Sequence, residues 1–322
     1  MRLLLALASL KFTPVGLVLL GAASVAVYKF DDSAAPWLSG PLFLLAVNLI
    51  AAVATNGVFR KQMPLLVFHL ALIVLVLLAA AGRLMYLKGT VEVTEGGEFQ
   101  GLKQRDAGPL HIDRLGVVRF INEGFEIDYT PGPMLDRLVN RVRWRDEAGN
   151  ERTAGIELNK PLILSGYRIY PTSNKGFAPV FLWHGPAHDS LLAAVHLPSY
   201  PANAAGQAQT WQPPGLPGEI WVMLDMQEDL IPSDKASRFR LPERRRIVIR
   251  HGEGRWEMEP GDRIELQQGT LEYRELRTWM GYRFFHDWTI PWMLAACAVA
   301  VASLSWHFWR KFAATPWNRD ND

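Results

Sequence analysis

The sequence predicts an integral membrane protein with four transmembrane helices and a large all-β, sandwich-like domain inserted between the third and fourth helices. Hydrophobic residues make up 49% of the 322 residues and charged residues only 20%, and the two classes occupy different parts of the chain. Apolar runs of membrane-spanning length fill roughly the first 87 and the last 35 residues. The segment between them carries nearly all of the charge, the turn residues and most of the prolines.

The apolar runs define the expected domains. We expect three helices within residues 1–87, a β-rich domain over residues 88–285, and a fourth helix with a short tail within residues 286–322. The helices themselves are expected at about residues 13–28, 38–58, 65–87 and 288–308. The first is the weakest, because Arg2 followed by an apolar run and "AASVA" resembles a cleaved secretory signal. Lys11 interrupts that run, which favours a retained anchor.

The distribution of positive charge predicts the orientation, because lysines and arginines in short loops stay on the cytoplasmic side of a membrane. The loop between the first two spans carries Asp31 and Asp32 against a single Lys29. The other ends of the spans carry the basic residues Arg2, Lys11, Arg60, Lys61, Arg310, Lys311 and Arg319. We therefore expect both termini in the cytoplasm and residues 88–285 in the periplasm of a bacterial cell, with the spans in its inner membrane.

The middle segment has the pattern of antiparallel β structure. Short alternating runs such as "GTVEVTEGG", "FEIDYTPG" and "GYRIYPTS" are separated by Gly, Pro, Asn and Asp. An antiparallel sandwich or open barrel is the expected architecture. Residues 198–218, "PSYPANAAGQAQTWQPPGLPG", are expected to form a long irregular insertion on its surface, either an ordinary mobile loop, which we favour, or a docking arm.

Several function classes are excluded by composition and motifs. The net charge of +2 and the absence of a basic stripe interleaved with aromatic residues argue against a nucleic-acid partner. Cys297 is the single cysteine, so a dithiol reductase or a c-type cytochrome is not expected. The sequence has no G-x-S-x-G, no H-E-x-x-H and no phosphate-binding glycine loop. No catalytic residue set is predicted.

His69 is the candidate functional residue, because it lies inside the third apolar run, "PLLVFHLALIVLVLLAAAG". An ionisable group within a span is costly and normally has a named partner. One interpretation is a neutral imidazole hydrogen-bonded to a backbone carbonyl, or to Asn48 or Asn56 on another span. The other is an axial ligand of haem iron, since imidazole is the usual protein donor to haem and a hydrocarbon environment suits a porphyrin. A six-coordinate haem would need a second ligand from elsewhere.

The other histidines are weaker candidates. His307, near the end of the last span, could supply that second ligand, but "SWHFWRK" resembles an interfacial belt, and His286 has a similar interpretation. His184 and His188 are four residues apart, but the glycine and proline between them argue against a helical metal pair. Ordinary surface or turn positions are expected for the remaining three, His111, His196 and His251.

Three stretches, in this order, resemble the ResB family, also called CcsB, of the System II cytochrome c maturation apparatus. The first is "MPLLVFHLALIVLVLLAAAGRLMYLKGTVEVTEGGEF" at residues 63–99, which is similar to the family's third span, its histidine and the exit from it. The second combines "FEIDYTPG" at 125–132 with "IELNKPLILSGYRIYPTS" at 156–173, similar to the family's N-x-P-L-x-x-x-G-x-x-x-Y signature. The third is "LRTWMGYRFFHDWTIPW" at 276–292, similar to the lead-in to the last span.

The resemblance implies a function in haem handling. ResB proteins work with a CcsA-type partner to move haem across the membrane, where it is attached to apocytochrome c. It also implies that His69 holds a transiently bound b-type haem and shares its iron with a histidine of the partner. The chain is short for the family and lacks a fused CcsA half, so alone it should not act as a holocytochrome c synthase (haem lyase). Two other classes stay open: a b-type cytochrome anchor that uses His69 and His307, and a structural anchor without a cofactor.

Overall fold

The computed structural model describes residues 2–30, 34–185 and 190–313. Four residues that the sequence analysis names lie outside these ranges: Asp31, Asp32, His188 and Arg319. The chain divides into two compact units. The helical unit comprises residues 1–88, 105–113 and 285–322, and the β unit comprises residues 89–104 and 114–284. Residues 105–113 therefore group with the helices, although we expected them within a β domain of residues 88–285. That expected boundary itself stays a prediction.

The helical unit contains the elements expected to cross a membrane. Its helices are α1 (Arg2–Leu7), α2 (Phe12–Phe30), α3 (Ala34–Thr55), α4 (Gly57–Lys61), α5 (Met63–Met85) and α6 (Ile290–Ala313). Four of these, α2, α3, α5 and α6, are long and apolar enough to span a bilayer. At most 22% of the residues in each span are buried within the protein, so their apolar side chains need lipid or another subunit around them. The chain is a membrane protein, as predicted.

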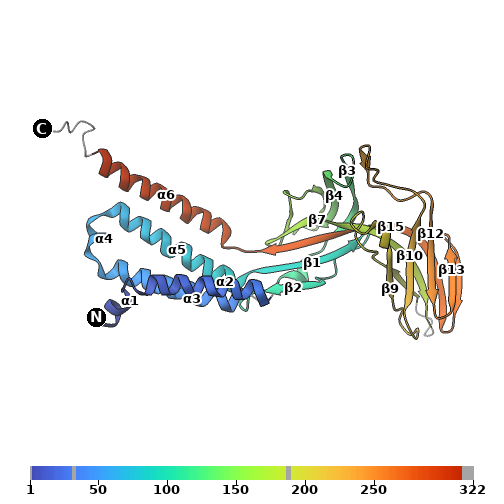
Figure 1. Ribbon diagram of the computed structural model, residues 1–322, viewed down its shortest axis with the longest axis horizontal. Helices are drawn as coiled ribbons and strands as arrows, with labels where there is room; N and C mark the ends of the chain where they lie inside the picture. The colour runs from blue at the N-terminus through green and yellow to red at the C-terminus, as the bar shows by residue number, and fades with distance from the viewer. Residues whose placement is uncertain (1, 31–33, 186–189, 314–322) are drawn as a thin grey trace. The chain divides into compact units, whose positions relative to one another are not determined.

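Local capping explains where the helices begin and end. The second span was expected to reach residue 58, but α3 ends at Thr55 because Asn56 starts a new helix and accepts a hydrogen bond from the backbone N–H of Val58 (3.0 Å). Pro64 lies in the first turn of α5, where its missing N–H costs nothing. In this unit α5 packs between α3 and α6, and α3 also packs against α2 (Figure 1).

The rest of the chain is dominated by β-strands, which confirms the predicted β domain. They are β1 (Leu87–Thr94), β2 (Gln104–Ala107), β3 (Ile121–Tyr129), β4 (Leu135–Arg145), β5 (Glu151–Ile156), β6 (Leu162–Leu164), β7 (Tyr167–His184), β8 (Ser190–Ala194), β9 (Ala208–Trp211), β10 (Ile220–Met226), β11 (Ser237–Arg238), β12 (Arg245–His251), β13 (Gly254–Met258), β14 (Arg263–Leu266) and β15 (Gly269–His286). Two short 3-10 helices, at Leu115–Val117 and Ala204–Gly206, interrupt the connections.

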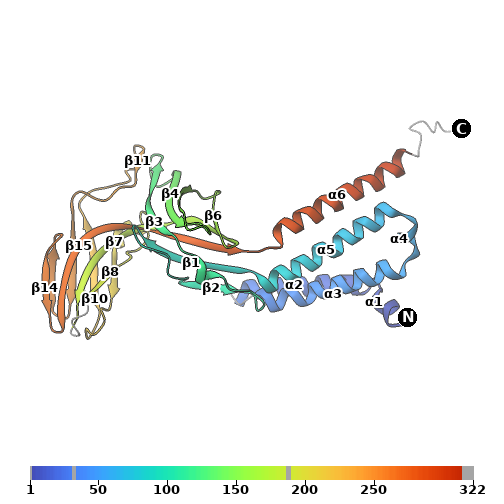
Figure 2. The same cartoon turned by 180° about the vertical axis from the view of Figure 1, so that it is seen from behind.

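The strands form three sheets. Two long strands of the largest sheet, β7 and β15, extend through both halves of the β unit, of which one contains β3 and β4 and the other contains β10 and β12. The largest sheet has the order β2-β1-β15-β7-β6, with β14 paired to β15 and β8 paired to β7. The other two are four-stranded, β13-β12-β10-β9 and β11-β3-β4-β5. Figures 1 and 2 show β7 and β15, each 18 residues long, running from the half that contains β3 and β4 into the half that contains β10 and β12.

Each four-stranded sheet packs against a different part of the largest sheet. In one half, Phe181 of β7 stacks on Trp211 of β9, with ring centroids 6.0 Å apart. In the other half, the Tyr282 hydroxyl of β15 donates a hydrogen bond to Oδ1 of Asn140 on β4 (2.8 Å). The architecture is therefore a pair of sandwiches that share β7 and β15, rather than the single sandwich or open barrel that the sequence pattern suggested.

A buried polar network lies between the sheets in the second half. The side chains of Asn122, Asn140 and Tyr282 are fully buried. The amide of Asn140 donates to Asn122 Oδ1 and to the carbonyl of Gly124 (2.8 Å each), and Asn122 donates to the carbonyl of Val93 (2.9 Å). Burial raises the pKa of Tyr282 and so keeps its hydroxyl protonated as a donor. The network joins β1, β3, β4 and β15.

The expectation for residues 198–218 is wrong in part. This segment contains strand β9, which pairs antiparallel with β10, and it buries Tyr200, Gln207 and Leu216. The amide of Gln207 donates to the carbonyls of Pro198 (3.1 Å) and Asn203 (2.7 Å). The Pro and Gly content correctly indicated turns, but the apolar residues between them are anchored in the core rather than carried on a surface loop.

Candidate functional site

His69 lies in the second turn of α5, and its ring is held by the start of that helix. Nδ1 lies 2.7 Å from the backbone carbonyl oxygen of Leu65, four residues earlier. Phe59 of α4 packs on the imidazole with ring centroids 4.5 Å apart, and the adjacent Phe68 makes an edge contact at 5.3 Å. Side chains on a helix lean toward its N-terminus, which accounts for contacts with residues 59 and 65 rather than with later turns.

The bond to Leu65 determines which ring nitrogen is available. A carbonyl oxygen can only accept, so Nδ1 carries the proton in this geometry and Nε2 keeps its lone pair. Within the part of the chain that the structure describes, Nε2 has no hydrogen-bond partner. A histidine that ligates a metal commonly has this arrangement, in which the other ring nitrogen donates to a backbone carbonyl and so holds the ring.

The two asparagines that the sequence offered as partners are engaged elsewhere. Asn48 accepts a hydrogen bond from the hydroxyl of Thr13 (2.8 Å) and donates to the carbonyls of Leu7 (2.7 Å) and Ser9 (3.1 Å). Asn56 caps α4. The interpretation of His69 as bonded to Asn48 or Asn56 is therefore wrong. The backbone-carbonyl interpretation is correct for Nδ1, and it leaves the interpretation of Nε2 as an iron ligand untested.

The structure places His307 and His286 at opposite ends of α6. His307 contacts Phe308 and lines a cavity together with the end of α4 and the start of α5. His286 precedes α6, and its ring lies 5.2 Å from that of His111, whose Nδ1 lies 3.0 Å from the carbonyl oxygen of Met85. His111 was expected in an ordinary surface or turn position, so this histidine pair, drawn from residues far apart in the sequence, is a finding of the structure.

Two of the three remaining described histidines make ordinary local contacts. Nδ1 of His184 lies 2.8 Å from the Ser190 hydroxyl, and Nδ1 of His251 lies 3.2 Å from the carbonyl oxygen of Glu219. Residues 2–30, 34–185 and 190–313 contain no group of three or more His, Cys, Asp or Glu that could hold a metal ion.

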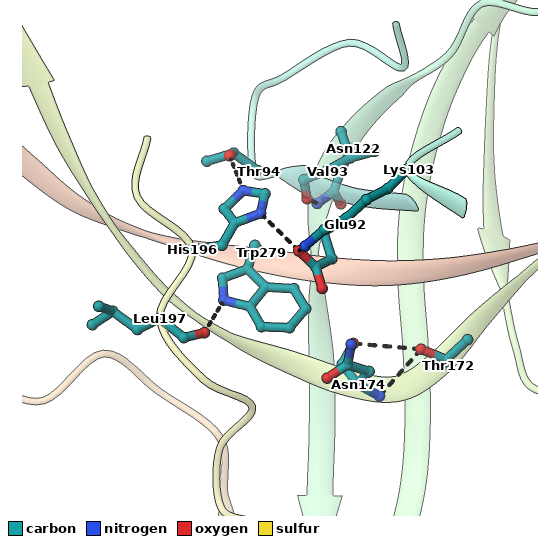
Figure 3. Close-up of polar contacts among 10 residues, drawn as sticks. All are labelled: Glu92, Val93, Thr94, Lys103, Asn122, Thr172, Asn174, His196, Leu197 and Trp279. Carbon is teal, nitrogen blue, oxygen red and sulfur yellow. Dashed lines mark hydrogen bonds and ion pairs between the residues drawn. The ribbon is translucent and has the colours of Figure 1, made fainter. Parts of the chain in front are cut away.

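A second polar cluster, centred on His196, lies in the β unit (Figure 3). Nε2 of His196 lies 2.8 Å from the hydroxyl of Thr94, and Nδ1 lies 3.4 Å from Glu92 Oε2, which Lys103 also contacts at 3.1 Å. The indole of Trp279 stacks on the imidazole, with centroids 5.4 Å apart. These residues come from β1, the strand connections and β15, so the cluster ties together three distant parts of the chain.

Backbone contacts hold this cluster in position. The N–H groups of Val195 and Leu197 donate to the carbonyls of Pro179 and Phe177 on β7 (3.0 Å each). Trp279 Nε1 donates to the carbonyl of Leu197 (3.1 Å). Gly176 is required here, because a Cβ atom at this position would lie 2.8 Å from Trp279 Nε1.

Two cavities of about 430 and 340 Å³ adjoin the cluster, and both are lined in part by Glu92, Lys103 and Asn174. The charged and polar groups of the cluster mainly contact one another. We therefore interpret it first as a structural clasp of the β unit.

The clasp predicts a pH dependence of stability. The hydrogen bond from His196, and then the contact with Lys103, hold the pKa of Glu92 at about 2 instead of its ordinary 4.5, although burial acts in the opposite direction. As pH falls, the unfolded chain binds the proton first, so this contribution is fully present above pH 4.5 and is lost as pH falls toward 2. We expect Glu92→Gln to lower the free energy of unfolding at pH 7 by about 2 kcal/mol, with the difference vanishing near pH 2.

Denaturant unfolding followed by tryptophan fluorescence at several pH values measures this difference. Glu126→Gln is the matched control, because Glu126 pairs with Arg141 through an exposed salt bridge (2.7 Å), which should contribute less than about 1 kcal/mol. An equal loss for both variants, or a loss for Glu92→Gln that persists undiminished near pH 2, would contradict the clasp.

The comparisons with known proteins bear on the same residues. Residues 47–199 match the model of the ResB-like family. This segment begins within α3, contains His69, Glu92, His111 and His196, and ends before β9, so α6 lies outside it. A comparison with curated proteins returned no match.

Proposed function

We propose, on the premise that this chain belongs to the ResB-like family, that it is a haem-handling membrane subunit of a cytochrome c maturation complex. Membership of the family associates the chain with cytochrome c biogenesis in general. The more specific proposal is that it works with a CcsA-type partner to export haem across the membrane and to support its attachment to apocytochrome c. Haem is then cargo rather than a resident cofactor, and His69 is the residue that holds it.

The observation that carries this proposal is the geometry of His69. Its Nδ1 is anchored on the Leu65 carbonyl, and no described residue hydrogen-bonds to its Nε2. A neutral imidazole with one nitrogen fixed and the other available is the donor that haem iron takes in proteins. The surrounding helix is almost entirely hydrocarbon, which suits a porphyrin, so the residues present fit the group.

The contacts of His69 are compatible with a ligand from a partner subunit. The ring contacts of His69 in the described chain are with Phe59 and Phe68, neither of which can ligate iron. We propose that a six-coordinate haem takes its second ligand from another chain, and the exposed apolar surfaces of the four spans leave room for one. A histidine of a CcsA-type subunit would supply it.

We further propose that both termini lie in the cytoplasm of a bacterial cell and that the β unit lies in the periplasm. The lysines and arginines at residues 60, 61, 310 and 311 support this orientation. The β unit would brace the partner and present the apocytochrome. Its free edges, such as β5 and β9, are suited to pair with an extended peptide by strand addition.

Absorbance spectra of the purified protein test the proposed function. The full chain should carry little haem when purified alone and a low-spin haem spectrum when purified with a CcsA-type partner. A reducible low-spin haem in the chain alone would instead indicate a b-type cytochrome anchor that uses His69 and His307. A complex without a Soret band would indicate a structural anchor and would end the proposal.

A further inference from the structure

Two large aliphatic side chains are exposed on a loop that belongs to the helical unit. Leu110 is 59% exposed and Ile112 is 66% exposed. Both lie within residues 105–113, the segment that groups with the helices rather than with the β unit. Apolar side chains that are exposed close together commonly mark an interaction surface. We call residues 108–112 the apolar loop.

Backbone hydrogen bonds fasten the apolar loop to the C-terminal end of α5. The N–H of Gly108 donates to the carbonyl of Tyr86 (2.9 Å), and the N–H of Leu110 donates to the carbonyl of Leu84 (2.8 Å). Gly108 is required for this close approach, because a Cβ atom at this position would clash with the carbonyl oxygen of Leu84. These contacts fix the height of the loop along the helix.

Polar side chains in and beside the apolar loop bind within the helical unit. Arg105 pairs with Asp113 (2.7 Å), and the hydroxyl of Tyr86 donates to Asp106 Oδ1 (2.6 Å). Nδ1 of His111 lies 3.0 Å from the last backbone carbonyl oxygen of α5. Polar groups that already have partners cost less free energy to move out of water. The two aliphatic side chains can therefore enter an apolar medium without carrying unpaired charges with them.

The apolar loop lies at the depth where α5 leaves the hydrocarbon of a bilayer. Leu84 is ten residues beyond Val74, the midpoint of Met63–Met85, and ten residues span about 15 Å of helix. Half the thickness of the hydrocarbon core is also about 15 Å. Trp288, whose Nε1 donates to the sulfur of Met85 (3.3 Å), lies at this level as well. Tryptophan is enriched at the interface between membrane and water, so the loop is at the membrane surface.

We propose that the apolar loop inserts Leu110 and Ile112 among the lipid acyl chains at this surface of the membrane. Lipid is the occupant because the loop continues, at the same depth, the exposed apolar surface of the spans. This attachment does not cross the membrane, and it limits how far α5 can slide along its own axis. His69, fifteen residues before Leu84, is thereby held about 22 Å below the loop. The attachment is independent of the function proposed above.

Fluorescence quenching of the full chain in phosphatidylcholine nanodiscs tests the insertion. Ile112→Cys and, separately, Leu110→Cys are combined with Cys297→Ala, and the new thiol is labelled with a nitrobenzoxadiazole fluorophore. Phosphatidylcholine with a nitroxide on its acyl chain should quench either label by about twofold or more, because inserted side chains lie roughly 5–10 Å into the boundary between headgroups and acyl chains. Iodide in the water should quench neither label.

Two matched positions calibrate the two quenchers. The native Cys297 is exposed on α6, so its label in the otherwise unchanged chain reports a position in lipid. Ile163 lies on β6 in the β unit and is 62% exposed, nearly as much as Ile112. A label at Ile163→Cys, again with Cys297→Ala, reports an aliphatic position in water.

Two outcomes would overturn the proposal. If iodide quenches both loop labels as strongly as the label at Ile163→Cys, the loop lies in water. If neither quencher reaches the loop labels, protein covers the loop instead of lipid. Quenching by the lipid nitroxide with protection from iodide, as for the label on Cys297, supports insertion. Neither outcome depends on haem binding, so failure here leaves the proposed function standing.

Discussion

Replacing His69 by glycine will remove haem from the protein co-purified with its CcsA-type partner, and added imidazole will restore it. The glycine removes the only proposed iron donor of this chain and leaves space in which free imidazole can bind the vacated axial position. We expect haem occupancy, measured as Soret absorbance per protein, to fall by about tenfold or more. Because imidazole cannot repair a helix, its effect separates loss of the ligand from the cost of about 1 kcal/mol for a glycine in a helix interior.

The matched control for this experiment is His251→Gly. His251 lies in the β unit, and its Nδ1 lies 3.2 Å from the carbonyl oxygen of Glu219, so the substitution removes an imidazole without touching α5. Haem occupancy should stay at the wild-type level. Normal occupancy in His69→Gly, or a loss that imidazole does not reverse, would remove His69 from the site.

Replacing Asn140 by alanine will lower the free energy of unfolding of the β unit by about 3 kcal/mol or more. The substitution removes a hydrogen bond from each of three buried partners, the carbonyl of Gly124, the hydroxyl of Tyr282 and Asn122 Oδ1, although Asn122 Oδ1 still accepts from the backbone N–H of Gly124 (3.0 Å). None of these can reach water, because Asn122 and Tyr282 are fully buried. Tyr282→Phe removes one bond of the same network and should cost about 1 kcal/mol.

Denaturant unfolding followed by near-ultraviolet circular dichroism measures these losses. Asn174→Ala is the matched control, because Asn174 is exposed and only its backbone atoms contact Thr172; it should change stability by less than about 0.5 kcal/mol. A loss for Asn140→Ala no larger than that of Asn174→Ala would mean that the network contributes specificity of packing rather than stability.

The helices could be predicted from the sequence, and His69 could be singled out as a candidate, because both depend on local composition. A run of apolar residues long enough to cross a bilayer can be recognised from the sequence alone. A single imidazole within that run can be recognised as well, because it is a polar residue among apolar ones. The exact ends were less predictable, since α3 ends where Asn56 caps the next helix. The partner of His69 was predictable only as a class, because the choice between Leu65 and Asn48 depends on packing.

The clasp around His196 could not be predicted, because its members lie far apart along the chain. His196 and Glu92 are 104 residues apart, so no local sequence pattern links them. The pairing of His111 with His286 is hidden in the same way. Residues 198–218 show the opposite difficulty: their proline and glycine content indicated a loop, whereas burial of Tyr200 and Leu216 is decided by distant strands.

The long strands β7 and β15 have a mechanical consequence. Because each extends through both sandwiches, neither half can lose its sheet without withdrawing hydrogen-bond partners from the other. The β unit should consequently melt in one transition, with amide protons of the two halves exchanging at a common rate under conditions of global opening. A force applied at one end of the β unit is transmitted to the other end through the continuous backbone of β7 and β15. A peptide bound to either sandwich would therefore exert force on both.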